Sequence, residues 1–351
     1  MKIQDRLRTL FRRTASSPQF NTTSIGDTIN RALGRAGLLR DVDAPQARAS
    51  SPAMRPRTAT PGIATPGSHF VARTYSSPNG SRDYKLFIPS TFSAAPSRRP
   101  GLLVMLHGCH QSADDTAAGT RMNQLAEQHG FLVAYPQQAS RSNNSKCWNW
   151  FRPEDQERGR GEPAVIAGIT EEVCDEFVID RKRVFAAGLS AGGAMAVIMA
   201  ATYPDMYSAI GVHSGLAFRS AHDVVSAFSV MRDGHHPGAR TPPGHARAVP
   251  TIVFHGDQDP TVSVRNSEAI IAHVLASQGG EPSILRSNAG EAGERHYTRA
   301  VYADEAHRDF LETWIVHGAG HAWSGGSPDG SHTDPAGPDA SAEMVRFFFS
   351  R

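Results

Sequence analysis

Residues 183–193, Arg-Val-Phe-Ala-Ala-Gly-Leu-Ser-Ala-Gly-Gly, decide the fold that we expect for this chain. A strand-like apolar run ends in Gly-Leu-Ser-Ala-Gly at 188–192, and a helix-forming run at 194–201 follows at once. This is the context of a nucleophile elbow, a turn so tight that side chains at its two glycine positions would collide with neighbouring backbone. The pattern predicts that Ser190 stands above a sheet, at the N-terminus of a helix whose dipole favours negative charge.

Repeated strand and helix signals surround this elbow. Continuous apolar runs are typical of strands covered on both faces, and they occur at 101–106, 131–135, 207–213 and 251–255. Helix-forming runs alternate with them at 113–128, 163–177, 192–203, 267–278 and 339–349. Antiparallel hairpins are expected at 70–89 and around 295–302, and the second leads into a strand at 311–316. The alternation predicts an α/β fold with a mostly parallel sheet, helices on both faces, and chemistry at the carboxyl ends of the strands.

The composition of the chain changes near residue 67. Arg, Ser, Thr, Ala and Pro dominate residues 1–67, so we expect a disordered leader and linker there, with one short helix near 25–39. A catalytic domain is expected at 68–351, with a His-, Pro- and Gly-rich insertion at 214–248.

Charge and hydropathy exclude several classes of partner. The chain has 36 Lys and Arg against 34 Asp and Glu, so we expect no nucleic-acid partner. No apolar run approaches the roughly 18 residues of a transmembrane helix.

The basic N-terminus lacks the apolar segment of a secretory signal, which favours a cytoplasmic location and leaves an extracellular one as the alternative. The oligomeric state is not predicted.

A serine nucleophile needs a base to take its proton and an acid to orient that base. In this fold the partners follow in the order Ser, acid, His, each after a later strand. The strand at 251–255 runs into Asp257 and Asp259. We favour Asp259 as the acid, because Asp257 is closer to the strand and suits a turn.

The candidate bases follow the strand at 311–316. His317 abuts that strand, whereas His321 lies in the middle of a loop of small residues. Such a loop lets an imidazole reach over the serine, so we favour His321. The chain has 16 histidines, so order and position carry this prediction rather than residue type.

An acyl-transfer intermediate also needs two N–H donors for its oxyanion. One is expected from Ala191, directly after the nucleophile, and the other from Cys109 in the loop at 106–111. The competing interpretation of that loop is a plain turn.

Tryptophans and cysteines near these motifs complete the candidate site. Trp148 lies in a polar loop that is either a small satellite core or a substrate-facing element, and Trp323 is expected to line the substrate pocket. Of the three cysteines, Cys174 suits a helix core, whereas a disulfide between Cys109 and Cys147 is left open.

Four motifs in order, Leu-His-Gly-Cys at 106–109, Cys-Trp-Asn-Trp at 147–150, the elbow at 188–193 and Gly-His-Ala-Trp at 320–323, resemble those of the polyhydroxybutyrate depolymerase esterase family. Related feruloyl and acetylxylan esterases share the pattern. The resemblance covers roughly residues 70–351. It implies an α/β-hydrolase fold, ester hydrolysis without metal or cofactor, and a triad of Ser190, Asp259 and His321.

The resemblance predicts a serine esterase acting on hydroxybutyrate polymers or oligomers, or on similar short-chain esters. Three alternatives remain: a feruloyl or acetylxylan esterase, a peptidase on the same fold, and a non-catalytic module that binds a granule or membrane surface. Many relatives in the family are secreted, which is the basis of the extracellular alternative.

Overall fold

The computed structural model describes residues 67–92, 99–234, 249–277, 283–304 and 308–350. All of them fall in one unit that spans Thr58–Arg351. The expected leader and its short helix lie outside the described residues, so the boundary near residue 67 stays a prediction.

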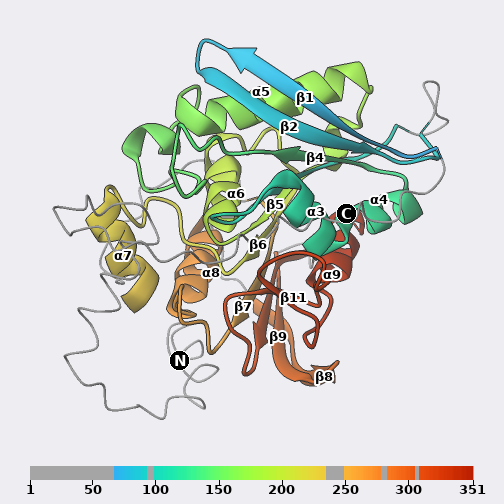
Figure 1. The fold of residues 1–351 in the computed structure, drawn as a ribbon. Helices are drawn as coiled ribbons and strands as arrows, with labels where there is room; N and C mark the ends of the chain where they lie inside the picture. Colours follow the sequence, from blue (N-terminus) through green and yellow to red (C-terminus); the bar gives the residue numbers. More distant parts are fainter. Residues whose placement is uncertain (1–66, 93–98, 235–248, 278–282, 305–307, 351) are drawn as a thin grey trace, which may run out of the picture. The chain divides into compact units, whose positions relative to one another are not determined.

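A ten-stranded sheet forms the centre of the described part of the chain (Figure 1). Its strands lie in the order β1-β2-β4-β3-β5-β6-β7-β10-β9-β8. In chain order they are β1 (His69–Ser77), β2 (Gly80–Ile88), β3 (Leu102–Leu106), β4 (Leu132–Pro136), β5 (Val184–Leu189), β6 (Ala209–His213), β7 (Thr251–Gly256), β8 (Ser283–Ala292), β9 (Arg295–Ala303) and β10 (Asp309–Val316). Neighbours in the central run of the sheet, β4-β3-β5-β6-β7-β10, pair in parallel. Antiparallel hairpins, β1–β2 and β8–β9, flank this run at both edges. The expected mostly parallel sheet is therefore confirmed.

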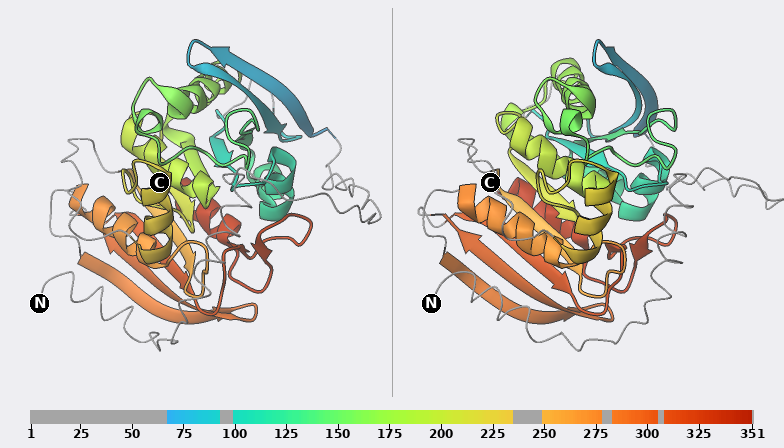
Figure 2. Two further views of the ribbon diagram at one scale, coloured as in Figure 1. Left: turned by 60° about the vertical axis from the view of Figure 1, so that its left-hand side comes forward. Right: turned by 90° about the vertical axis from the view of Figure 1, so that its left-hand side faces the viewer.

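Helices cover both faces of this sheet, as expected (Figure 2). On one face α3 (Ala113–Thr120), α4 (Met122–His129) and α9 (Ala340–Phe349) pack together. On the other lie α5 (Gly161–Glu176), α6 (Ala191–Thr202) and α8 (Arg265–Ser277), with α7 (Val224–Asp233) packed on α8. Short elements complete the described chain: η1 (Pro153–Gln156), η2 (Arg181–Arg183), β11 (Trp323–Ser324) and β12 (Thr333–Asp334).

The strand order places a topological switch point between β3 and β5. The chain passes from β3 to β4 on one side, and then returns to add β5 on the other side of β3. Loops that leave the carboxyl ends of two such strands diverge to opposite faces and open a crevice between them. The loop after β3 and the elbow after β5 therefore meet at the point where this fold class binds its ligands.

The structure departs from the sequence expectations at three elements. The expected helix at 113–128 is two helices, because Arg121 between them adopts a left-handed conformation with φ 54°. The hairpin expected around 295–302 is longer, since that segment is only its second strand, β9, and pairs with β8. The insertion at 214–248 contains helix α7, while its residues 235–248 lie outside the described chain.

Candidate active site

The turn between β5 and α6 has the backbone of a nucleophile elbow. Ser190 adopts φ 57° and ψ −119°, a region that residues with a Cβ rarely occupy. A Cβ on Gly188 would lie 2.5 Å from the carbonyl oxygen of Leu106, and one on Gly192 would overlap the same oxygen. Two glycines are therefore required for the turn to pass β3, as the sequence pattern predicts.

The elbow leaves the backbone amide of Ala191 available to a ligand. Ser190 donates its own N–H to the carbonyl oxygen of His213 at 2.9 Å, so that group is already engaged. Ala191 is the first residue of α6, where a backbone N–H has no partner within the helix. The side chain of Ser190 stands beside this amide in the field of the helix N-terminus.

Asp259 and His321 form a buried acid–base pair. The Oδ2 atom of Asp259 accepts a hydrogen bond of 2.7 Å from Nδ1 of His321, and the Asp259 side chain is 0% exposed. Its Oδ1 atom accepts the backbone N–H groups of Thr261 and Val262, each at 2.8 Å. Burial alone would raise the pKa of Asp259, but hydrogen bonds from His255 and His321 outweigh it and lower the pKa well below the usual range. The carboxylate is thus ionised and fixed, which is what orienting an imidazole requires.

A second Asp–His pair lies directly beside the first. Nδ1 of His317 is 2.9 Å from Oδ2 of Asp257, and Nε2 of the same ring is 2.9 Å from the hydroxyl of Thr298. Asp257 also accepts the backbone N–H of Gly318 at 2.7 Å. Both ring nitrogens of His317 therefore have partners. In His321 only Nδ1 is engaged among the described residues, which leaves Nε2 for proton transfer.

The sequence does not single out His255, but its ring lies beside the carboxylate of Asp259. Its Nε2 lies 2.8 Å from the carbonyl oxygen of Val262 and 3.4 Å from Oδ2 of Asp259, and its Nδ1 lies 2.6 Å from the Ser267 hydroxyl. Because a carbonyl only accepts, Nε2 carries the proton and faces the carboxylate. The only sequence signal is a histidine at the end of the strand that precedes Asp259.

The loop after β3 approaches the elbow with one amide unengaged. A Cβ built on Gly108 would lie 3.7 Å from Cβ of Ser190. Gly108 donates its N–H to Oε1 of Gln111 at 2.8 Å, and His110 donates to the carbonyl oxygen of Ser145 at 2.7 Å. The N–H of Cys109, between them, has no hydrogen-bond partner among the described residues. It is therefore available to a ligand, and its role as an oxyanion donor stays a prediction.

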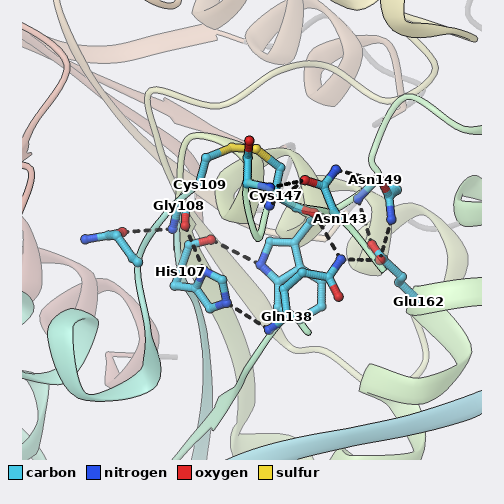
Figure 3. Close-up of a disulfide and its surroundings, with 11 residues drawn as sticks. His107, Gly108, Cys109, Gln138, Asn143, Cys147, Asn149 and Glu162 are labelled. Atoms are coloured by element: carbon cyan, nitrogen blue, oxygen red, sulfur yellow. Dashed lines mark hydrogen bonds between the residues drawn. A yellow bond between two sulfur atoms is a disulfide. The ribbon is translucent and has the colours of Figure 1, made fainter. Parts of the chain in front are cut away.

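A disulfide joins Cys109 to Cys147 and ties this loop to the one after β4 (Figure 3). Hydrogen bonds reinforce the link, because the His107 ring donates from Nδ1 to the Gly108 carbonyl at 2.7 Å and accepts the Gln138 N–H at Nε2, at 2.9 Å. Buried Glu162 holds the far side of the second loop, where it accepts both N–H and Nδ2 of Asn149 (Figure 3). The covalent link that the sequence left open is thus present, and it fixes the amide of Cys109.

The two tryptophans considered for substrate contact, Trp148 and Trp323, are buried. Trp148 is 0% exposed and donates its indole N–H to the carbonyl oxygen of His107 at 3.1 Å. Trp323 is 2% exposed and donates to the hydroxyl of Ser341 at 3.0 Å. Trp323 lines a small cavity beside Thr116 and Thr120, and the hydrogen bonds of both indoles hold loops of the site. Trp148 follows the satellite-core interpretation of its loop.

Two features are absent from the described residues. In this part of the chain no group of three or more His, Cys, Asp or Glu side chains could hold a metal ion. None of its helices is both long and apolar enough to cross a membrane.

Comparison with known proteins identifies the family. The sequence model of the family described as Esterase PHB depolymerase matches residues 82–297, more than half of the chain. Poly(3-hydroxyalkanoate) depolymerase C of Paucimonas lemoignei is 32% identical over 243 residues, which are 65% of this chain and 56% of the depolymerase. Feruloyl esterase B of Neurospora crassa is 29% identical over 238 residues, which are 64% of this chain and 78% of that esterase.

The fold is shared with a solved esterase structure. An acetyl xylan esterase from Aspergillus awamori superposes with a TM-score of 0.60 at 20% sequence identity, over 80% of this chain and 98% of that one. The expected α/β-hydrolase fold is thereby confirmed.

Proposed function

Because this chain belongs to the esterase PHB depolymerase family, we propose that it hydrolyses carboxylic esters through an acyl-enzyme intermediate. The observation that carries the proposal is the set of three groups at neighbouring strand ends. These are Ser190 in its strained elbow, the buried pair of Asp259 with His321, and the unengaged amide of Cys109. The chain spans about half of the depolymerase that it matches, so substrate and activity are inferred from this set rather than transferred.

In the first half of the reaction, Nε2 of His321 takes the proton of the Ser190 hydroxyl while the oxygen attacks the ester carbonyl carbon. The amides of Ala191 and Cys109 hold the resulting oxyanion, and Asp259 stabilises the imidazolium. When the tetrahedral intermediate collapses, the bond to the alkoxide breaks and His321 passes its proton to the leaving oxygen.

In the second half, a water molecule gives a proton to the same imidazole and attacks the acyl-enzyme carbonyl. Collapse of the second tetrahedral intermediate breaks the bond to Ser190, which recovers its proton from His321. The acid is released, Ser190 and His321 return to their starting states, and the reaction consumes only the ester and one water molecule.

Two substrate classes compete for this site. The match to a poly(3-hydroxyalkanoate) depolymerase favours hydroxybutyrate polymers, oligomers or similar short-chain esters. The matches to feruloyl and acetylxylan esterases support feruloyl or acetyl esters of cell-wall sugars as the alternative. A granule-binding module without catalysis is less well supported, since it leaves the buried Asp259–His321 pair without a role.

The disulfide bears on where the enzyme works. Disulfides persist in oxidising compartments and are rare in the reducing cytosol. The link between Cys109 and Cys147 therefore favours the extracellular alternative over the cytoplasmic location expected from the N-terminus.

A substrate panel with one active-site variant tests the proposal. The purified chain is assayed on p-nitrophenyl esters from acetate to decanoate, on hydroxybutyrate oligomers and on methyl ferulate. We expect turnover of at least one class, and a loss of at least about a thousandfold in Ser190→Ala. Ser76→Ala, on the exposed β1–β2 hairpin, is the matched control and should keep the wild-type rate. Turnover retained in Ser190→Ala, or sedimentation with polyester granules without any turnover, would overturn the esterase assignment.

A further inference from the structure

One residue links the nucleophile to the loop that carries the base. His213 is the last residue of β6 and lies beside β5, where it pairs with Leu189. Its carbonyl oxygen accepts the N–H of Ser190 at 2.9 Å. Its ring nitrogen Nε2 accepts the N–H of Ser324 at 3.0 Å. Ser324 lies three positions after His321, so one residue holds both segments.

The ring of His213 is fixed from every side. It is 1% exposed and stacks between Trp323, with ring centroids 5.2 Å apart, and Phe254, with centroids 5.9 Å apart. Nδ1 lies 3.2 Å from the hydroxyl of Ser214. Since a backbone N–H can only donate, Nε2 must be unprotonated, and the proton of the neutral ring is on Nδ1.

The charge state of the ring agrees with this arrangement. The pKa of His213 is lowered to about 3. Burial is the largest cause, and the nearby rings of His255 and His321 add to it. The ring therefore stays neutral, and Nε2 stays an acceptor, at any pH where the protein works. It is not available as the general base.

We propose that His213 is a positioning residue that sets the separation between the Ser190 hydroxyl and the His321 ring. The inference rests on the proposed esterase function, which assigns those two groups the chemistry. A misplacement of about 1 Å at reacting atoms lowers rates by roughly a hundredfold, so a fixed connection between the two segments matters.

Other bonds hold the loop that carries His321 to other elements. Two of them run to the segment after β7, where His321 contacts Asp259 at 2.7 Å and Ala319 accepts the N–H of Gln258 at 3.0 Å. The hydroxyl of Ser324 donates to the carbonyl oxygen of Pro338 at 2.7 Å, and the indole of Trp323 donates to Ser341 on α9. These contacts fix the loop to the C-terminal helix. Among the described residues, the hydrogen bond from Ser324 to His213 joins this loop to β6, the strand beside the elbow, so its loss leaves the loop held but misaligned.

A matched pair of variants separates the hydrogen bond from the stacking. His213→Gln places an amide oxygen near the position of Nε2 and retains an acceptor for Ser324. His213→Asn places its amide near Nδ1, too short to reach. Both lose the aromatic stack equally. We expect kcat for p-nitrophenyl acetate to fall about 10- to 100-fold in His213→Asn with KM within about twofold, and to recover within about fivefold of wild type in His213→Gln.

The rate at which a p-nitrophenyl phosphonate labels Ser190 should follow kcat, because labelling needs the same alignment without substrate turnover. Ile210→Val, a core change at the other end of β6, controls for stability and should label at the wild-type rate at a comparable melting temperature. If either polar variant does not fold, His213→Phe keeps the stack, removes the acceptor and should match the loss expected for His213→Asn.

The outcomes distinguish this inference from the proposed function. Wild-type protein that neither hydrolyses esters nor reacts with the phosphonate overturns the function. An active wild type with full activity in His213→Asn or His213→Phe overturns only the role of His213, as does equal loss in the Gln and Asn variants.

Discussion

Asp259 contacts His321 at 2.7 Å, while Asp257 and His317, two and four positions away in the chain, form a separate pair at 2.9 Å. The two pairs differ in whether the second ring nitrogen of the histidine has a hydrogen-bond partner. Nε2 of His317 lies 2.9 Å from Thr298, whereas Nε2 of His321 is unengaged among the described residues. Both histidines follow β10 and contact an aspartate, but only His321 keeps a ring nitrogen that can exchange a proton with another group.

This difference predicts unequal effects of the same substitution. Asp259→Asn should lower kcat about ten-thousandfold, because the imidazole loses its orienting acceptor, and His321→Ala should lower it at least about a thousandfold. Asp257→Asn and His317→Ala should each lower kcat less than about tenfold, since the bond from His321 to Asp259 and the bond from Ser324 to His213 still hold the base in place. Steady-state kinetics on p-nitrophenyl acetate measures all four. A larger loss in His317→Ala than in His321→Ala would exchange the two roles.

Gly192→Ala should destabilise the whole fold. The added Cβ would overlap the backbone carbonyl of Leu106, which is fixed in the sheet and has no room to move. We expect a loss of at least about 3 kcal/mol in the free energy of unfolding, measured in urea. Gly320→Ala is the matched control, because a Cβ there meets nothing within 4 Å, and it should change stability by less than about 0.5 kcal/mol. Equal stability of the two variants would contradict the elbow packing.

Cys147→Ser should loosen the oxyanion loop as well as the fold. The disulfide closes a loop with a sequence separation of 38, for which chain entropy alone predicts about 3–4 kcal/mol of stability. We expect that loss on chemical unfolding, together with lower kcat, because the amide of Cys109 is no longer fixed. Dithiothreitol should lower wild-type activity and leave Cys147→Ser unchanged. A reductant effect of equal size on both proteins would exclude this disulfide as its cause.

Asp155→Asn should flatten the pH dependence of stability. Burial, followed by the charge of Glu162, raises the pKa of Asp155 to about 7 in the folded protein, whereas the unfolded chain titrates near its ordinary value of about 4. The folded state therefore holds the proton more tightly, and its stability falls as pH rises between these two values. An amide cannot ionise, so the Tm of the variant minus that of the wild type should be a few degrees larger at about pH 8 than at about pH 5.

The control for this titration is Glu291→Gln, an exposed carboxyl on β8 that should keep the wild-type slope. Parallel Tm–pH curves for wild type and Asp155→Asn would show that Asp155 does not titrate in this range.

The parts of the site that could be predicted from the sequence are those encoded locally. Gly188 and Gly192 flank Ser190 for a steric reason that any chain must obey, and the order of serine, acid and histidine follows from the order of the strands. The preference for Asp259 over Asp257 agrees with the geometry of the two pairs, although its catalytic role stays a prediction.

The parts that could not be predicted depend on contacts between distant segments. His213 and His255 are two of 16 histidines, and nothing in their neighbouring residues shows that Ser324 or Asp259 lies beside them. Trp148 sits in a polar loop, and only the fold of the whole chain buries it. Strand β8 (Ser283–Ala292) lacks the alternation of a half-buried strand and forms because β9 pairs with it.

The conformation of Ser190 creates a trade-off between stability and activity at this position. A residue with a Cβ held at φ 57° and ψ −119° stores strain on the order of 1–3 kcal/mol, which the packing around it must offset. Ser190→Ala keeps the Cβ and so keeps the strain. Ser190→Gly removes it, and the inactive protein should unfold at a higher temperature than the active one. Selection for folding alone would replace this serine with glycine, so its presence reflects selection for the hydroxyl.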